Sequence, residues 1–194
     1  KPPRQRIANS KERIVKPYAI SHMPLAPLVE GGGQEFGLRS GTENVPNIVG
    51  LAEALHISEE IKTRESVRIR DLRDYLWQGI RKIYEKARIN GPAPDGKSRD
   101  RRLPNNLNVW LPSIGAEEAV VFLDLHGVAV SAGSACAARS TEPSHVLLAM
   151  GMDEKRARQS IRISLGRRTA KKEIDTMIQI VGKLVRRMKD RRRI

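Results

Sequence analysis

The most regular feature of the chain is a set of apolar residues at steps of three and four positions, which is the period of an amphipathic helix. Between Pro46 and Lys86 this pattern predicts one long helix or two in series. Pro46 suits the first turn of that helix, with Asn44 or Thr42 as its cap. Near the C-terminal end, the same period predicts another helix, capped by Thr169. Its apolar positions are Ile174, Met177, Val181, Leu184 and Met188.

Alternation of apolar and other residues, the period of a strand, occurs in the second half of the chain. It predicts strands at residues 107–111 and 161–165, and the β-branched run Val128–Ser131 predicts a third. Helices are predicted at Ala116–His126 and from about Pro143 to Gly151, each with a glycine at its end. Strands that alternate with helices in this way indicate a compact α/β domain.

Three segments show neither period. The first 27 residues mix Pro, Lys, Arg and Ser, and residues 90–104 form a loop rich in Pro, Gly and charge. The third segment, Gly31–Asn44, carries five glycines within eleven residues. A loop of that composition either turns sharply or lets its backbone approach a ligand closely.

The composition, with 39% hydrophobic residues among 194, is that of a globular protein. The net charge of +14 is concentrated at the ends, because residues 1–30 carry +4, residues 166–194 carry +8 and the rest only +2. Aromatic residues make up 4% and no stacking motif interleaves the basic ones, which argues against a nucleic-acid partner. No apolar run is long enough to cross a membrane and no signal-peptide core is present, so we expect a cytoplasmic protein.

The single cysteine, Cys136, excludes an internal disulfide and a multi-cysteine zinc site. It lies in SAGSACAARS, among residues too small to bury it deeply and too irregular for a packed helix face. Two interpretations stay open. A free cysteine is commonly a small buried apolar residue, whereas an exposed thiolate on a loop is a nucleophile.

Arg162 lies in the strand-like SIRISLG, on the opposite face from the isoleucines beside it. A guanidinium held on a strand suits bidentate binding of a carboxylate, although it equally suits a solvated sheet face. In the glycine-rich segment, residues 39–42 can present a guanidinium, backbone amides and a hydroxyl to a phosphate. The four histidines lack metal-ligand spacing, so we expect them to be structural or superficial and we expect no metal site.

Three motifs occur in order: GGGQEFGLRSGTENVPNIVGLAEAL, SAGSACAARSTEPSHVLLAMGMDEKRARQSIRISLGRRT, and the closing amphipathic helix. Together they resemble the C-terminal half of NifS/IscS-type cysteine desulfurases, pyridoxal-phosphate enzymes of the class V aminotransferase family, over about residues 25–190. The resemblance implies an α/β fold, namely the small C-terminal domain of a fold-type I pyridoxal-phosphate transferase with a remnant of the large cofactor domain. It implies three parts: residues 1–44 from the cofactor domain, residues 45–88 as connecting helix, and residues 89–194 as the small domain.

The same resemblance implies a function for individual residues. Cys136 would take sulfur from L-cysteine and hold it as a persulfide, which leaves L-alanine, and Arg162 would bind the substrate carboxylate. Thr42 would contact the phosphate of pyridoxal 5'-phosphate in the partner subunit of a homodimer. The persulfide sulfur would pass to acceptor or iron–sulfur scaffold proteins for cluster or thio-cofactor assembly.

One part of the family pattern is not identifiable. Family members carry the lysine that binds pyridoxal phosphate in an SxHK-type stretch upstream of the glycine-rich loop, followed by a GPKG-type turn. Lys1 has about the right spacing from Gly31, but the residues after it do not resemble that turn. We therefore expect the 194-residue chain to be inactive alone.

A different class of function stays open beside the enzyme. The chain could be a non-enzymatic α/β module, a sulfur carrier or scaffold whose basic ends contact acidic partners or nucleic acid. Within the enzyme class, selenocysteine in place of cysteine as substrate is equally compatible with the residues.

Overall fold

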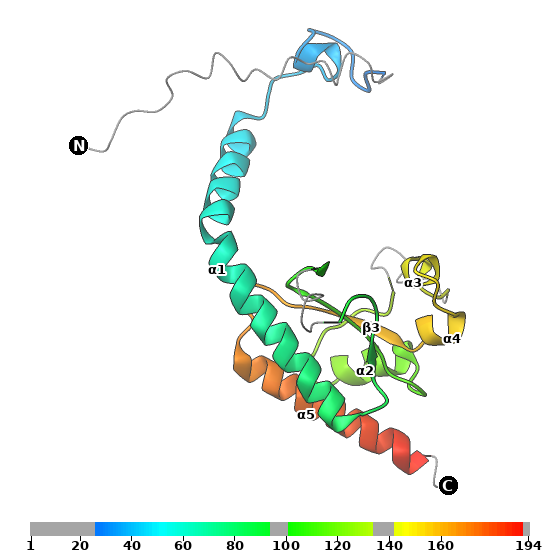
Figure 1. Ribbon diagram of the computed structural model, residues 1–194. Helices are drawn as coiled ribbons and strands as arrows, with labels where there is room; N and C mark the ends of the chain where they lie inside the picture. Colours follow the sequence, from blue (N-terminus) through cyan, green and yellow to red (C-terminus); the bar gives the residue numbers. More distant parts are fainter. Residues whose placement is uncertain (1–25, 94–100, 134–141, 192–194) are drawn as a thin grey trace, which may run out of the picture. The chain divides into compact units, whose positions relative to one another are not determined.

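The structure is a computed structural model that describes residues 26–93, 101–133 and 142–191 (Figure 1). Contacts divide the chain into a unit that ends at Leu55 and a second unit that begins at His56, and each is described by itself. The domain boundaries predicted at residues 44 and 88 stay predictions. No described helix is long and apolar enough to span a membrane.

The first unit contains the glycine-rich segment and the start of the long helix. A short 3-10 helix, η2 (Glu35–Gly37), precedes helix α1 (Val45–Ile83), which continues into the second unit. The Asn47 amide donates to Asn44 Oδ1 at 3.3 Å, so Asn44 is the cap of α1. The prediction of a long helix from Pro46 to Lys86 is therefore confirmed, as one continuous helix with ends shifted by a few residues.

The second unit contains an antiparallel sheet of three strands, β1 (Arg88–Ile89), β2 (Asn106–Trp110) and β3 (Ser160–Ser164), in that order. The strands predicted at 107–111 and 161–165 are confirmed with ends shifted by one residue. The register places Arg88 opposite Trp110 on one edge of β2 and Asn108 opposite Arg162 on the other. Because alternate side chains share a face, these four residues lie on the same side of the sheet.

Four helices accompany this sheet: α2 (Ala116–Asp124), α3 (His145–Ala149), α4 (Glu154–Ala157) and α5 (Lys171–Arg191). The core packs the apolar face of β2 and β3 against the second half of α1, α2 and α5. Its fully buried members include Leu76, Leu107, Val109, Leu123, Ile161 and Val181. The helix predicted at 116–126 is confirmed, and the one predicted at 143–151 is shorter than expected.

The prediction of a strand at Val128–Ser131 is wrong. Only Ser131 pairs with β3, through one isolated bridge in which it exchanges two backbone hydrogen bonds with Arg162. The Val128 amide instead donates to the Leu123 carbonyl at 2.9 Å, after Gly127 with φ of 79°. The first residue of the run therefore takes part in the C-terminal hydrogen bonds of α2. Too few extended residues remain after it to form a continuous ladder with β3.

The prediction that Thr169 caps the last helix is also wrong. Helix α5 begins at Lys171, and Thr169 Oγ1 accepts from the Gly166 amide at 2.9 Å instead. The Glu173 carboxylate accepts from the Ala170 amide at 2.8 Å, so an acidic residue in the first turn satisfies the helix end. The threonine hydroxyl stabilises the preceding turn.

Helix α1 packs against α5 at Gly79. A Cβ there would lie 2.8 Å from Cγ1 of Ile178 and closer still to its Cδ1, whereas a Cβ at Gly50 of the same helix would meet no atom within 4 Å. We expect Gly79→Ala to lower the free energy of unfolding by about 1–2 kcal/mol, because Ile178 must repack. We expect Gly50→Ala to raise it by about 0.5–1 kcal/mol, since alanine favours helix. Urea unfolding followed by circular dichroism measures both, and effects of the same sign would contradict the packing at Gly79.

Candidate functional site

The polar face of the sheet carries the candidate substrate site. Arg162 projects from the middle of β3 and is half-buried, directly opposite Asn108 on β2. Both residues, together with Asn106, line a cavity of about 340 Å³. That volume is within the range of about 300–1,000 Å³ usual for small-molecule sites. Arg162 was expected on the face opposite the neighbouring isoleucines, and in the structure that face lines the cavity.

Two further arginines line this cavity, and they have different roles. Arg102 donates to three main-chain carbonyls, those of Asn90, Pro92 and Asn106, at 2.6–3.2 Å. The pKa of Arg102 lies below its ordinary value, chiefly because burial desolvates the guanidinium and secondarily because the positive charge of Arg73 repels it. Its donors are used to hold the loop that leads into β2. Arg101, by contrast, is exposed at the rim.

The guanidinium of Arg162 makes no hydrogen bond and no ion pair with the residues that the structure describes. A half-buried cation without a partner attracts an anion, and its planar fork matches the two oxygens of a carboxylate. The Asn106 and Asn108 side chains add polar groups to the same wall. The arrangement fits a small molecule with one carboxylate.

A buried polar network supports this wall. Asn90, 3% exposed, donates from Nδ2 to Asn108 Oδ1 at 2.7 Å and to Ser160 Oγ at 2.9 Å. Its Oδ1 accepts from Arg156 Nε at 2.9 Å. The Asn90 side chain, just after β1, therefore connects β2, β3 and α4, and it fixes the orientation of Asn108 beside Arg162.

Cys136 lies outside the described residues. The structure is described up to Gly133 before it and again from Glu142 after it. Gly133 and Ser144 both line the Arg162 cavity. A Cβ on Gly133 would lie 3.8 Å from the Ser144 Cβ, so these two positions are neighbours. Described residues on both sides of Cys136 in the sequence therefore line the same cavity as Arg162.

Thr42 lies in the glycine-rich segment, which belongs to the first unit. The Ser40 amide donates to the Val29 carbonyl at 3.0 Å, and the Gly41 amide donates to Gln34 Oε1 at 3.2 Å. The loop therefore uses these two amides to fold on itself, and a phosphate site at residues 39–42 stays a prediction. Arg39 and Thr42 remain, both exposed on a cavity of about 600 Å³.

Sequence reasoning identified Arg162 but missed Asn106 and Asn108. A signal was available, because both asparagines alternate with buried Leu107 and Val109 and so occupy the polar face. Asn90 and Arg102 gave no comparable signal, since they lie in or beside the loop that the composition marks only as irregular. Thr42 and Arg162 belong to different units.

Residues 28–177 match the family model for aminotransferase class V, and the chain belongs to that family. It is 36% identical over 173 residues to a cysteine desulfurase IscS of Clostridium botulinum strain Hall, which covers 89% of this chain and 43% of that protein. It is 45% identical over 162 residues to the cysteine desulfurase IscS of Pectobacterium carotovorum, covering 84% of this chain and 38% of that protein. The chain thus spans about two fifths of the length of these relatives.

The comparison with solved structures agrees with the comparison of sequences. A NifS-like protein superimposes with a TM-score of 0.67 at 35% identity, over 84% of this chain and 40% of that one. The NifS-like protein of Rickettsia africae also has a TM-score of 0.67, at 31% identity over 85% of this chain and 41% of that one. The predicted family and the α/β fold class are therefore confirmed.

Proposed function

We propose that this chain is the C-terminal part of a pyridoxal-phosphate-dependent cysteine desulfurase, with L-cysteine as its substrate. The observation that carries the proposal is the half-buried Arg162 guanidinium, which has no partner among the described residues and lines a cavity large enough for an amino acid. The names of the relatives supply the reaction class.

In this proposal Arg162 binds the substrate carboxylate through two charge-assisted hydrogen bonds. Asn108, held by the buried Asn90, contributes a polar group at the same wall. Substrate is therefore oriented by groups whose own positions are fixed by the sheet, which reduces the entropy lost when the reacting atoms are aligned.

The residues of the first unit fit the phosphate of the cofactor. Gly41 has φ of 111°, and a Cβ there would lie 3.0 Å from Arg39 Nη1, so the missing side chain leaves room for that guanidinium. Arg39 and Thr42 would hold the phosphate of the cofactor in the partner subunit, while Glu35 and Glu43 on the same cavity are exposed and their charges are screened by solvent. Bound pyridoxal phosphate supplies the electron sink that makes the chemistry at the substrate carbon possible.

Cys136 performs the sulfur transfer in this proposal. Its thiolate attacks the substrate sulfur, so an S–S bond forms as the C–S bond of the substrate breaks. The electron pair of the broken bond stays on the carbon, which takes a proton and becomes the methyl group of L-alanine. The persulfide on Cys136 then passes its outer sulfur to a protein acceptor, such as an iron–sulfur scaffold.

A homodimer and a cytoplasmic location complete the proposal. The first turns of α1 expose several large apolar side chains at helical spacing, which supports coverage by another surface of the assembled protein. These residues are Val45, Ile48, Val49, Leu51 and Leu55.

The experiment is a hybrid enzyme. The Pectobacterium carotovorum relative is expressed with its matching segment replaced by this chain's residues, and alanine and sulfide are measured with L-cysteine, pyridoxal phosphate and a thiol reductant. We expect turnover by the hybrid and a loss of at least about a hundredfold with Cys136→Ser, because serine is a poor nucleophile toward sulfur. The variant should still bind L-cysteine, seen as a change in the cofactor absorption.

Two outcomes would contradict the proposal. A Cys136→Ser hybrid that forms alanine as fast as the unchanged hybrid would show that this thiol is not the sulfur acceptor. A folded, cofactor-loaded hybrid without turnover, whose Cys136 still accepts sulfur from an added persulfide donor, would favour the sulfur-carrier alternative.

A further inference from the structure

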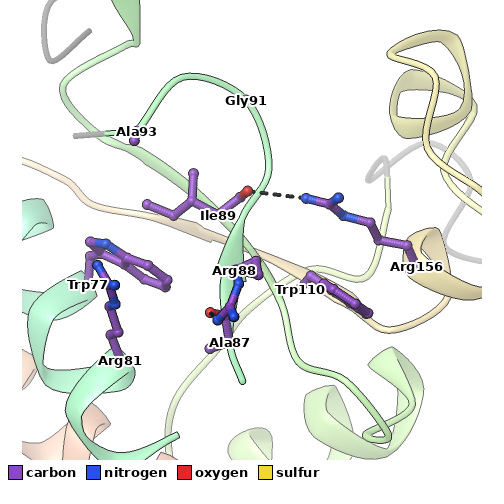
Figure 2. Close-up of a pocket in the computed structure, with 9 residues that line it drawn as sticks. All are labelled: Trp77, Arg81, Ala87, Arg88, Ile89, Gly91, Ala93, Trp110 and Arg156. Atoms are coloured by element: carbon purple, nitrogen blue, oxygen red, sulfur yellow. Dashed lines mark hydrogen bonds between the residues drawn. The ribbon is translucent and has the colours of Figure 1, made fainter. Parts of the chain in front are cut away.

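A second cavity, of about 490 Å³, has a different lining from the Arg162 cavity, and among the described residues only Gly91 belongs to both. Its lining residues come from the last turns of α1, from β1 and its neighbours, from the end of β2 and from α4 (Figure 2). Two tryptophans and three arginines line it: Trp77, Trp110, Arg81, Arg88 and Arg156. The desulfurase proposal gives none of these five residues a contact with substrate, and Arg156 enters it only through its hydrogen bond to Asn90.

Among the described residues that line this cavity, three are arginines and none is acidic, so their net charge is positive. Arg81 is exposed and makes no hydrogen bond or ion pair within the described part of the chain. Within the described residues, the Arg88 guanidinium donates to the carbonyls of Glu85 and Ala87 alone. Arg156 donates to uncharged acceptors, the Asn90 side chain and the Ile89 carbonyl. Three guanidinium groups around one hollow attract an anion.

The Trp110 ring is held in place by two neighbouring side chains. Trp110 donates from Nε1 to Gln159 Oε1 at 3.2 Å, and the Arg156 guanidinium lies 5.1 Å from its ring centroid. Trp77 is half-buried and precedes Arg81 by one helical turn, so both face the cavity from α1 (Figure 2). Rings that are already ordered lose little entropy when a flat ligand stacks on them.

We propose that this cavity binds a nucleoside phosphate, with the base stacked on indole and the phosphate held by the arginines. Indole faces are stacking surfaces for nucleobases, and guanidinium forks bind phosphate oxygens in pairs. An aliphatic anion would use the arginines and leave the rings uncovered, whereas an uncharged aromatic ligand would leave the cations unpaired. The volume is in the range of small-molecule sites.

The same chemistry has two sources, a free nucleotide or the end of a single nucleic-acid strand. The two tryptophans lie 33 positions apart, at 77 and 110, and Arg156 is more distant still, so no stacking motif is visible before the chain folds. The site stands on geometry that is independent of Arg162, Thr42 and Cys136, and its test does not require desulfurase activity.

The chain offers a direct reporter, because its only two tryptophans both line the cavity. We expect AMP to quench the intrinsic tryptophan fluorescence of the chain saturably. Adenosine, which lacks the phosphate, and ribose 5-phosphate, which lacks the base, should each bind at least about tenfold more weakly. Equal affinity for AMP and ribose 5-phosphate would overturn the proposal, and so would the absence of AMP binding in equilibrium dialysis.

Matched variants locate the effect. Arg81→Ala should weaken AMP binding about tenfold, whereas Arg186→Ala, which removes an exposed charge from α5 outside the cavity, should leave it unchanged. Equal weakening by both would show a response to overall charge and overturn the site. Trp77→Phe and Trp110→Phe leave one reporter each, and quenching must persist in at least one of them.

A short single-stranded oligoadenylate distinguishes the two sources. If it competes with AMP and binds more tightly, with the same loss in Arg81→Ala, the site takes the end of a strand. If it competes less well than AMP, the site takes the free nucleotide. Binding that does not compete with AMP and is insensitive to Arg81→Ala would exclude the strand as an occupant of this cavity.

Discussion

Arg162→Ala in the hybrid desulfurase is expected to lower kcat/KM for L-cysteine about a hundredfold, which corresponds to about 2.7 kcal/mol. The guanidinium is half-buried and has no partner within the described residues, so the substrate carboxylate would lose its only charge-assisted contact on β3. The effect is smaller than for a fully buried ion pair because solvent reaches the site. Steady-state kinetics with L-cysteine gives the ratio directly.

A second substitution at position 162 distinguishes the contribution of the paired guanidinium donors from that of the positive charge. Arg162→Lys keeps the positive charge but loses the paired donors, so we expect an intermediate loss of about tenfold. The matched control is Arg158→Ala, an exposed arginine that forms an ion pair with Glu154 on α4, and its kcat/KM should be unchanged. A loss with Arg162→Ala no larger than that with Arg158→Ala would refute a role for Arg162 in carboxylate binding.

Arg73→Leu is expected to lower the free energy of unfolding by about 3 kcal/mol or more. Arg73 is completely buried on α1; its Nε donates to Asp74 Oδ1 at 2.8 Å and its Nη1 to the Leu103 carbonyl at 2.9 Å. Without the guanidinium, the buried Asp74 carboxylate, 8% exposed, loses this cation, and the Leu103 carbonyl loses its donor. Urea unfolding of the chain measures the difference.

A control variant and a double variant test whether the loss is specific to the buried Arg73–Asp74 pair. Arg64→Leu changes an exposed arginine on the same helix, and we expect an effect within about 0.5 kcal/mol. The double variant Arg73→Leu/Asp74→Leu removes both charges and should be more stable than Arg73→Leu alone. Strictly additive losses would mean that the pair is not energetically coupled.

Much of the fold could be predicted because its elements are encoded by local periodicity. Leu107 and Val109 alternate with asparagines, and strand β2 forms at these residues. The prediction failed at Val128–Ser131, where a β-branched run signals a strand but the Val128 amide is taken by the end of α2. Likewise, Thr169 has the chemistry of a cap, yet the turn at Gly166 uses its hydroxyl. Local preference was overridden in both places by a competing hydrogen bond.

The candidate site was predictable only in part. The face occupied by Arg162 follows from the period of two, since the isoleucines beside it must be buried. Its neighbours do not follow, because Asn108 comes opposite Arg162 only once the register of β2 and β3 is set. Asn90 and Arg102, which hold this wall, act from loop and edge positions whose partners are distant in sequence.

The sequence by itself determined the class V aminotransferase family, the long helix, two of the strands and the face on which Arg162 lies, because short-range pattern and motif order carry that information. Only the tertiary structure decided that Arg73 is buried and that Trp77, Trp110 and Arg156 surround one cavity. The physical reason is that periodicity states which side of each element avoids water, whereas the meeting of distant side chains depends on strand register and helix packing.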